Sequence, residues 1–127
     1  MKIPKDCLKK YTIIQPDPTL RNNLMVFGFE IGEGWMSLVI ELLDKIQHLV
    51  DNNPEYSGLQ VIQVKEKFAQ LRVYLNYYYK EIEDLIEEYT EKSVHICELC
   101  GETGETRNLH GWYMTLCDKH YEERLGK

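Results

Sequence analysis

The sequence predicts an α+β protein in which a helix, an antiparallel β-hairpin and a second helix precede a cysteine-rich C-terminal segment. Three patterns support this prediction. Apolar residues recur with helical spacing from Trp35, apolar and polar residues alternate over 71–78, and helical spacing returns over 79–92. Each pattern gathers its apolar residues on one face of the predicted element, where neighbouring elements can bury them.

The first predicted helix begins at Trp35, because apolar residues follow it at steps of three and four as far as Val50. It should end near 51–54, where the run Asp-Asn-Asn-Pro favours a helix terminus. The residues of this stripe are Trp35, Leu38, Val39, Leu42, Leu43, Ile46, Leu49 and Val50.

The segment before this helix, residues 1–34, shows little periodicity, and only a short strand over 25–29 is expected. Its glycine-rich run, GFEIGEGW, could bind an anion on backbone amides ahead of the helix. However, no Gly-Lys-Ser/Thr run follows, and Glu30 and Glu33 would repel phosphate. We therefore expect a tight structural turn that delivers Trp35 into the core.

Two strands are predicted after the helix, over 59–68 and 71–78. The second is the clearer one, because apolar and polar residues alternate along it. The link at Ala69-Gln70 is short enough for an antiparallel hairpin, although it lacks the Asn-Gly pair that favours such turns.

The second predicted helix, over 79–92, places Ile82, Leu85, Ile86 and Tyr89 on one face. Acidic residues occupy most of the remaining positions. A solvated acidic face is the favoured interpretation, because charge runs usually face water. An acidic patch for a basic partner is the alternative.

Four residues near the C-terminus have the spacing of a tetrahedral zinc site. Two residues separate the members of each pair, so that one turn of chain can present both ligands, and sixteen residues separate the pairs. Because four protein ligands leave no open coordination position, we expect a structural Zn²⁺. So short a segment buries little apolar surface, and metal binding should supply much of its folding free energy. The predicted ligands are Cys97, Cys100, Cys117 and His120.

The elements predicted around these ligands resemble a treble-clef zinc finger. The run CELCG suits a tight knuckle, and residues 106–114 suit a hairpin. Thr115 and Asp118 resemble a capping box, which would place Cys117 and His120 on the first turn of a closing helix. The resemblance implies a treble-clef-like fold for this segment and leaves its function open.

The length of 127 residues suits a small core with a satellite module. We expect an α+β core domain over 1–93 and a zinc-binding, treble-clef-like module over 94–127. The net charge of −6 argues against a general nucleic-acid binder. The N-terminus lacks the apolar run of a signal peptide, and three of the four cysteines are needed as thiolates, so we expect a cytoplasmic protein. The remaining thiol, Cys7, is expected to be buried or incidental.

No catalytic arrangement is predicted. A Ser-His-Asp or Cys-His set cannot be assembled, because His48 lies on a predicted helix without an evident partner. The run LCDKH with Asn108 and His110 resembles HNH-type nucleases, but the hairpin lacks a His-His pair and His120 already belongs to the zinc pattern. The chain is therefore expected not to be an enzyme.

The outward face of the predicted hairpin interleaves cations with aromatic rings. Such a surface can stack a base and neutralise a phosphate, although exposed hairpin faces are commonly decorated in this way. Its ligand could be single-stranded nucleic acid, a nucleotide or the acidic patch of a protein. The candidate ligand-binding residues are Lys65, Lys67, Arg72, Tyr74 and Tyr78.

The runs GFEIGEGW, VKEKFAQLRVY, CELCG and TLCDKH together resemble small proteins of bacteriophages and prophages that end in a zinc finger. The resemblance spans about 28–120, but those proteins commonly place glycine after the phenylalanine, where this chain has Ala69-Gln70. It implies a phage-type protein, in a bacterial or infected host cell, that binds a host protein or nucleoprotein. Such a stoichiometric binder could inhibit a bacterial defence or regulatory system. The alternative is a nucleic-acid or nucleotide-binding module that uses the hairpin face.

Overall fold

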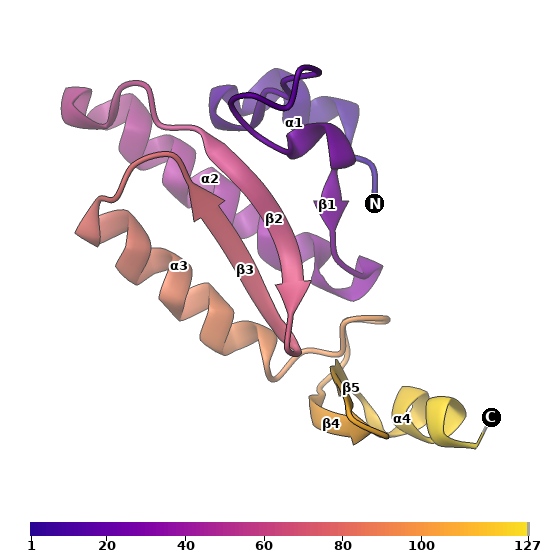
Figure 1. The fold of residues 1–127 in the computed structure, drawn as a ribbon. Coiled ribbons are helices and arrows are strands. Elements are labelled where there is room, and N and C mark those ends of the chain that lie inside the picture. Colours follow the sequence, from indigo (N-terminus) through magenta and orange to yellow (C-terminus); the bar gives the residue numbers. More distant parts are fainter. Residues whose placement is uncertain (127) are drawn as a thin grey trace.

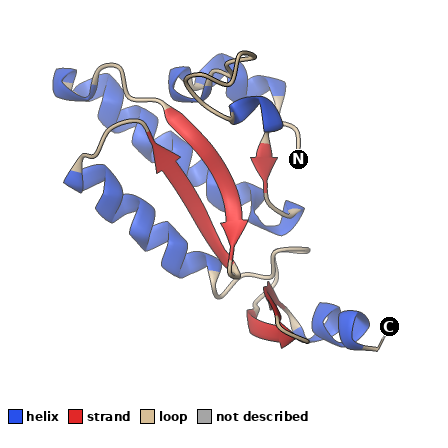
Figure 2. Cartoon of the chain, in the orientation of Figure 1, coloured by secondary structure: helices blue, strands red, loops and turns tan. Residues whose placement is uncertain are grey.

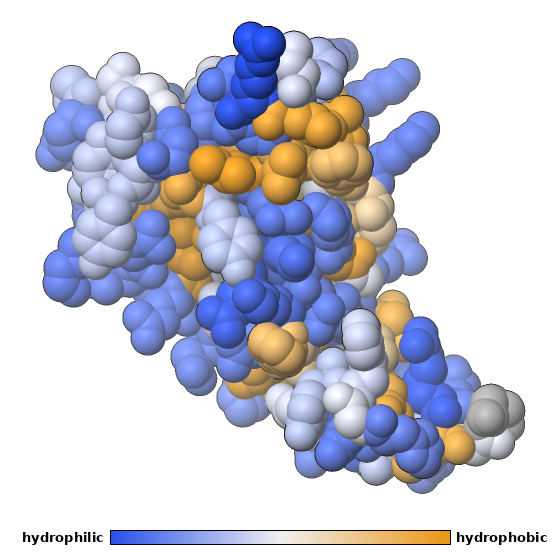
Figure 3. Space-filling view, viewed as in Figure 1, coloured by the Kyte–Doolittle hydropathy of each residue, from blue (hydrophilic) through white to orange (hydrophobic). Residues whose placement is uncertain are grey.

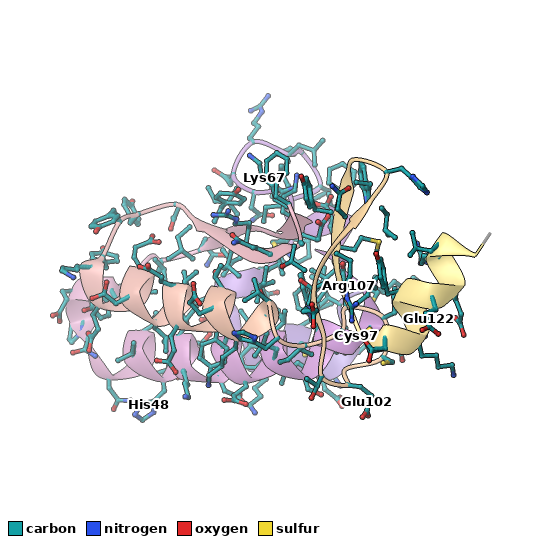
Figure 4. All side chains as sticks on the ribbon, turned by 90° about the horizontal axis from the view of Figure 1, so that it is seen from below. His48, Lys67, Cys97, Glu102, Arg107 and Glu122 are labelled. Atoms are coloured by element: carbon teal, nitrogen blue, oxygen red, sulfur yellow. The ribbon has the colours of Figure 1, made fainter. Side chains whose placement is uncertain are left out.

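Two helices and a three-stranded sheet form the body of the protein in a computed structural model that describes residues 1–126 (Figures 1 and 2). The strands β1 (Phe29–Glu30), β2 (Val61–Lys67) and β3 (Gln70–Leu75) lie in that order, and β2 pairs parallel with β1 and antiparallel with β3. Helices α2 (Met36–Asn52) and α3 (Lys80–Ser93) lie against the same face of the sheet (Figure 4). The predicted α+β class and the order helix, hairpin, helix are confirmed.

The core lies between this sheet face and the two helices. The predicted stripe of α2 is buried as far as Ile46, while Leu49 and Val50 are half-buried at its edge. Helix α2 starts at Met36, because Trp35 ends a short 3-10 turn, η3 (Glu33–Trp35). The buried residues of the two helices and the hairpin include Trp35, Leu38, Val39, Leu42, Leu43, Ile46, Val61, Val64, Leu71, Val73, Ile82, Ile86 and Tyr89.

The N-terminal segment is more ordered than its sequence indicates. It forms helix α1 (Lys5–Lys10) and the 3-10 turns η1 (Thr12–Ile14) and η2 (Met25–Phe27). The strand expected over 25–29 is therefore wrong for its first four residues, and within this segment only β1, which begins at Phe29, pairs with β2. Cys7 is the buried residue of α1, and this burial raises the pKa of its thiol.

The β2–β3 hairpin is confirmed, with a turn one residue earlier than expected. Lys67 pairs with Gln70, so Phe68 and Ala69 form the two-residue loop. Both have left-handed backbones, with φ of 51° and 67°, as a type I′ turn requires. Asn and Gly usually fill these positions, because a left-handed conformation strains other residues. The strand also ends earlier than expected, at Leu75.

The C-terminal part contains a second sheet and a last helix. Strands β4 (Glu105–Leu109) and β5 (Trp112–Leu116) pair antiparallel, and helix α4 (Asp118–Leu125) follows. This part lies at one end of the body, beyond the β2–β3 turn (Figure 1). The treble-clef-like order of knuckle, hairpin and helix is present. The domain boundary at 93/94 stays a prediction.

No helix within residues 1–126 combines the length and the apolar character that crossing a membrane requires.

The strained hairpin turn gives a testable prediction. Phe68→Asn should stabilise the protein by about 1 kcal/mol, because Asn tolerates a left-handed backbone and Phe68, 70% exposed, loses little burial. The free energy of unfolding from urea denaturation measures the effect. Phe27→Asn is the control, since Phe27 is also exposed but has an ordinary backbone. An equal increase in the free energy of unfolding of both variants would contradict the proposed backbone strain at Phe68.

Candidate metal centre

The structure brings the four predicted ligands together. Their ligand atoms all lie within 4.8 Å of one another. The Sγ of Cys97 lies 3.6 Å from Nδ1 of His120, the two Sγ atoms of Cys100 and Cys117 are 3.8 Å apart, and Cys117 Sγ lies 3.2 Å from the same Nδ1. Tetrahedral ligands of a zinc ion lie roughly 3.5–3.8 Å apart, given its bond lengths. These side chains could therefore hold one metal ion of that kind.

The two ligand pairs come from different kinds of local structure. Cys97 and Cys100 lie on the knuckle that follows α3, where the Gly101 N–H donates to the Cys97 carbonyl (2.9 Å). Cys117 is the N-cap of α4, and its Sγ accepts a hydrogen bond from the His120 N–H (3.5 Å). His120 thus lies on the first turn of α4, as its spacing indicates.

The capping role predicted for Thr115 is wrong. Thr115 is fully buried in β5, where its hydroxyl donates to the Ala69 carbonyl (2.7 Å). This bond satisfies a polar group at the β2–β3 turn and ties that turn to the C-terminal module. A capping pattern and a buried strand hydroxyl are alike in sequence, because both place Thr shortly before a helix.

Backbone amides prepare Cys97 to bind a metal. Burial raises the pKa of its thiol, but N–H groups of Cys117, Cys100 and Leu99 stabilise the thiolate and lower the pKa to about 6. Cys97 is then mainly a thiolate at neutral pH. For Cys100 the Glu102 N–H lowers the pKa, but burial and the neighbouring thiols outweigh it and raise the pKa. A cation held among these thiolates would remove their mutual repulsion.

The glycine-rich turn before α2 packs directly on the knuckle. A Cβ added at Gly34 would overlap the Cys97 carbonyl, and one at Gly32 would overlap the Glu98 carbonyl. The Gly34 N–H donates to the Glu98 carbonyl (2.8 Å). Glycine is needed at position 34 because two backbones meet there without room for a side chain.

Two side chains reinforce this contact. The Trp35 indole N–H donates to the Ile96 carbonyl (2.8 Å), and the Gly32 N–H donates to Oε2 of Glu98 (3.0 Å). Burial raises the pKa of Glu98, although the hydrogen bond from Gly32 opposes the shift. The expected structural turn is thus present, and two of its amides already have acceptors in the knuckle.

Arg107 fixes α4 against the second hairpin. Its guanidinium donates to the Leu116 carbonyl (3.1 Å) and to Asp118 Oδ1 (2.6 Å), and it lies 4.5 Å from the ring centre of Tyr121. In Figure 4 the Arg107 side chain lies between the hairpin and the final helix. The helix that carries Cys117 and His120 is therefore held by a contact separate from the metal.

The five candidate binding residues on the hairpin fall into two groups. Lys65, Lys67, Arg72 and Tyr74 lie on the face of the hairpin that points away from the core, as their alternation with buried residues requires. Hydrophilic residues cover the middle of this open face (Figure 3). Tyr78 follows the end of β3 and is exposed, so it lies outside the strand that was expected to contain it.

A groove of about 500 Å³ lies between β3 and α3. Arg72, Tyr74 and Tyr78 line one side of it, and the acidic residues of α3 line the other. Part of the acidic face predicted for α3 therefore lines this groove. Whether it also receives a basic partner stays a prediction.

Three exposed aromatic residues near the hairpin turns were not predicted as a site. Phe68, Trp112 and Tyr113 are 70%, 66% and 45% exposed, and they line one cleft between the β2–β3 and β4–β5 turns. Their separation by more than forty residues conceals this grouping in the sequence. The available signal was the Gly-Trp-Tyr run at the second turn, which places large rings where burial is difficult.

No protein-family model, no curated protein and no solved structure matches the chain. The fold and the site themselves define its class. It is an α+β protein that ends in a treble-clef-like module with a Cys₃His cluster able to hold a metal ion.

The close approach at Gly34 gives a second prediction. Gly34→Ala should lower the free energy of unfolding by about 2 kcal/mol, because the new methyl group forces the knuckle backbone away from the turn. Urea denaturation of the metal-loaded protein measures this loss. Glu33→Ala is the matched control on the same turn, where the exposed side chain should contribute less than about 0.5 kcal/mol. Equal stability of the Gly34 variant and the wild type would contradict the packing argument.

Proposed function

We propose that the chain is a zinc-stabilised binding protein rather than an enzyme. The observation that carries this proposal is the ligand set: three thiols and one imidazole from the protein meet within 4.8 Å of one another. Sulfur-rich sets of this kind favour Zn²⁺, and four protein ligands leave no coordination position for a substrate or water. Bound zinc would therefore act as a structural crosslink.

The contacts around the cluster support a structural role. The closing helix α4 buries no residue, so apolar packing does little to hold it. Cys117 and His120 would join α4 to the knuckle through the metal, while Arg107 joins it to β4. Zinc binding would thus supply folding free energy to the part of the chain with the least core of its own.

Metal removal tests the zinc assignment. We expect one zinc per chain by elemental analysis, a tetrahedral Co²⁺ spectrum after substitution, and loss of amide-exchange protection over 95–125 on chelation. Cys97→Ala should lose the metal. Cys7→Ala should retain it, because Cys7 lies outside the cluster. Unchanged amide exchange after complete metal removal would contradict a structural role.

The partner is proposed to be a host macromolecule, and its binding could inhibit a bacterial defence or regulatory system. This proposal rests on the resemblance of the glycine turn, hairpin and knuckle runs to phage and prophage proteins. The open hairpin face supports a binding role, since it carries cations and exposed rings in an otherwise acidic chain. We place the interaction on this face and on the adjoining aromatic cleft.

Capture from a bacterial lysate tests the binding role. The immobilised wild-type chain should retain one macromolecular partner at stoichiometric yield. Lys65→Ala/Arg72→Ala should lose that partner, because both side chains lie on the proposed face. Lys5→Ala/Lys9→Ala removes the same charge from exposed positions on α1 and should retain it. Failure to recover any reproducible partner, or equal recovery by both variants, would count against the proposal.

A further inference from the structure

Three cations share the open face of the β2–β3 hairpin without carboxylate partners. Lys65 lies directly opposite Arg72 in the antiparallel register, and Lys67 follows two residues along the same face. No ion pair in residues 1–126 includes any of the three. Like charges directly across two strands repel. An anion bound over this face would convert that repulsion into attraction.

Arg72 has unused hydrogen-bonding capacity. Its Nη2 donates to Gln70 Oε1 (2.7 Å), but its buried Nε has no acceptor. It is the only buried, unpartnered side-chain nitrogen or oxygen among the described residues. A buried donor without an acceptor is costly in a folded protein. The guanidinium is therefore held by one neutral side chain and keeps its charge available to a ligand.

The turns of two hairpins form a cleft next to these cations. Phe68–Ala69 and His110–Gly111 are both two-residue turns with left-handed backbones. The hydrogen bond from Thr115 to Ala69 holds the hairpins together (2.7 Å). The cleft has a volume of about 260 Å³. Its lining consists of Glu66, Lys67, Phe68, Gly111, Trp112 and Tyr113.

The cleft suits one planar group. Its three aromatic residues are exposed rings with no core to fill, and Phe68 retains its position despite a strained backbone. Aromatic rings stack on any nucleobase, because every base has a π face. The volume leaves room for a single such group rather than for an extended apolar segment.

Lys67 belongs to both surfaces. It lines the aromatic cleft, and it lies on the open face in line with Lys65. Alternate residues of a strand are ~7 Å apart, so these cations form a short row that leads away from the cleft. Figure 4 shows Lys67 on the side of the sheet opposite α2, the side toward which the β4–β5 turn also projects.

We propose that this combined surface binds single-stranded nucleic acid. One base stacks in the cleft against Phe68 and Trp112, and neighbouring phosphates lie over Lys67, Lys65 and Arg72. The proposal rests on the binding role proposed above and names the class of its ligand. Unpaired cations beside exposed ring faces are the two features that such a ligand needs together.

The negative net charge limits this interaction without preventing it. Charges more than about 8–10 Å away are largely screened at physiological salt, so the contacting cations dominate. The acidic side of the groove beside Arg72 confines the phosphates to the row of cations. Binding should therefore be local, with only about three phosphates neutralised. A duplex should bind poorly, because its bases are not free to enter the cleft.

Tryptophan fluorescence tests the proposal directly. The chain has two tryptophans, and Trp35 is fully buried, so a contacting ligand should affect mainly Trp112. Titration of the zinc-loaded chain with a short oligothymidylate or oligouridylate should quench Trp112. The logarithm of the affinity should fall with the logarithm of salt concentration with a slope of about −2, from three phosphate contacts on a single strand.

Variants separate the two halves of the surface. Lys65→Ala/Arg72→Ala should reduce the slope to about −0.7, since one cation remains, whereas Lys5→Ala/Lys9→Ala should leave it unchanged. Phe68→Asn should weaken binding about ten-fold or more without changing the slope, because a stacking ring is lost. Its expected gain in stability shows that any loss of binding is not due to unfolding.

Absence of quenching at low salt, or equal binding of duplex and single strand, would overturn the inference. If lysate capture still recovers one protein after nuclease treatment, the binding role stands and its ligand is a protein. If both experiments fail, the proposed binding role falls as well. Oligonucleotide binding that requires Phe68 and the Lys65/Arg72 pair supports both the proposed binding role and the single-stranded ligand.

Discussion

The backbone contact between the glycine turn and the metal knuckle is the constraint on which the rest of the structure depends. At Gly34 the backbones of the turn and of the knuckle approach so closely that no Cβ fits. Hydrogen bonds from Gly34 and Trp35 to the knuckle stabilise this contact. Trp35 is also the first large residue of the core stripe. One short segment thus joins the start of α2 to the cysteine pair at Cys97, so helix packing and ligand geometry constrain each other.

A second contact joins the C-terminal module to the β2–β3 turn at the surface. Thr115 precedes the ligand Cys117 by two residues, and its hydroxyl bonds to Ala69 in the turn of the other hairpin. The ligand cluster, the β4–β5 hairpin and the β2–β3 turn are therefore linked through very few bonds. A metal that orders the C-terminal module would also order one wall of the aromatic cleft. The ligand cluster and the aromatic cleft are in this sense two parts of the same arrangement.

The sequence predicts those features that depend on spacing within one segment. The stripe of α2 and the Cys/His ligand pairs each have a period that local geometry imposes. The sequence does not predict the short helices and turns of the N-terminal segment, because they bury residues without a regular period. The misplaced turn at Phe68–Ala69 and the misread Thr115 have another cause. Both depend on a partner from a distant hairpin, and the contact at Ala69 outweighs local turn and capping preferences.

The strained backbone of the Phe68–Ala69 turn also bears on the function of the aromatic cleft. An Asn-Gly pair would satisfy the backbone at Phe68 and Ala69, but neither residue could supply a ring beside Trp112. Ala69 is fully buried, and its carbonyl accepts the hydrogen bond from Thr115, so its small side chain has a packing reason. Phe68 has none, since most of its ring faces solvent. The proposed binding of a negatively charged strand would explain a residue that costs stability and gains no burial, because Phe68 would stack on a base beside Lys67 and Lys65.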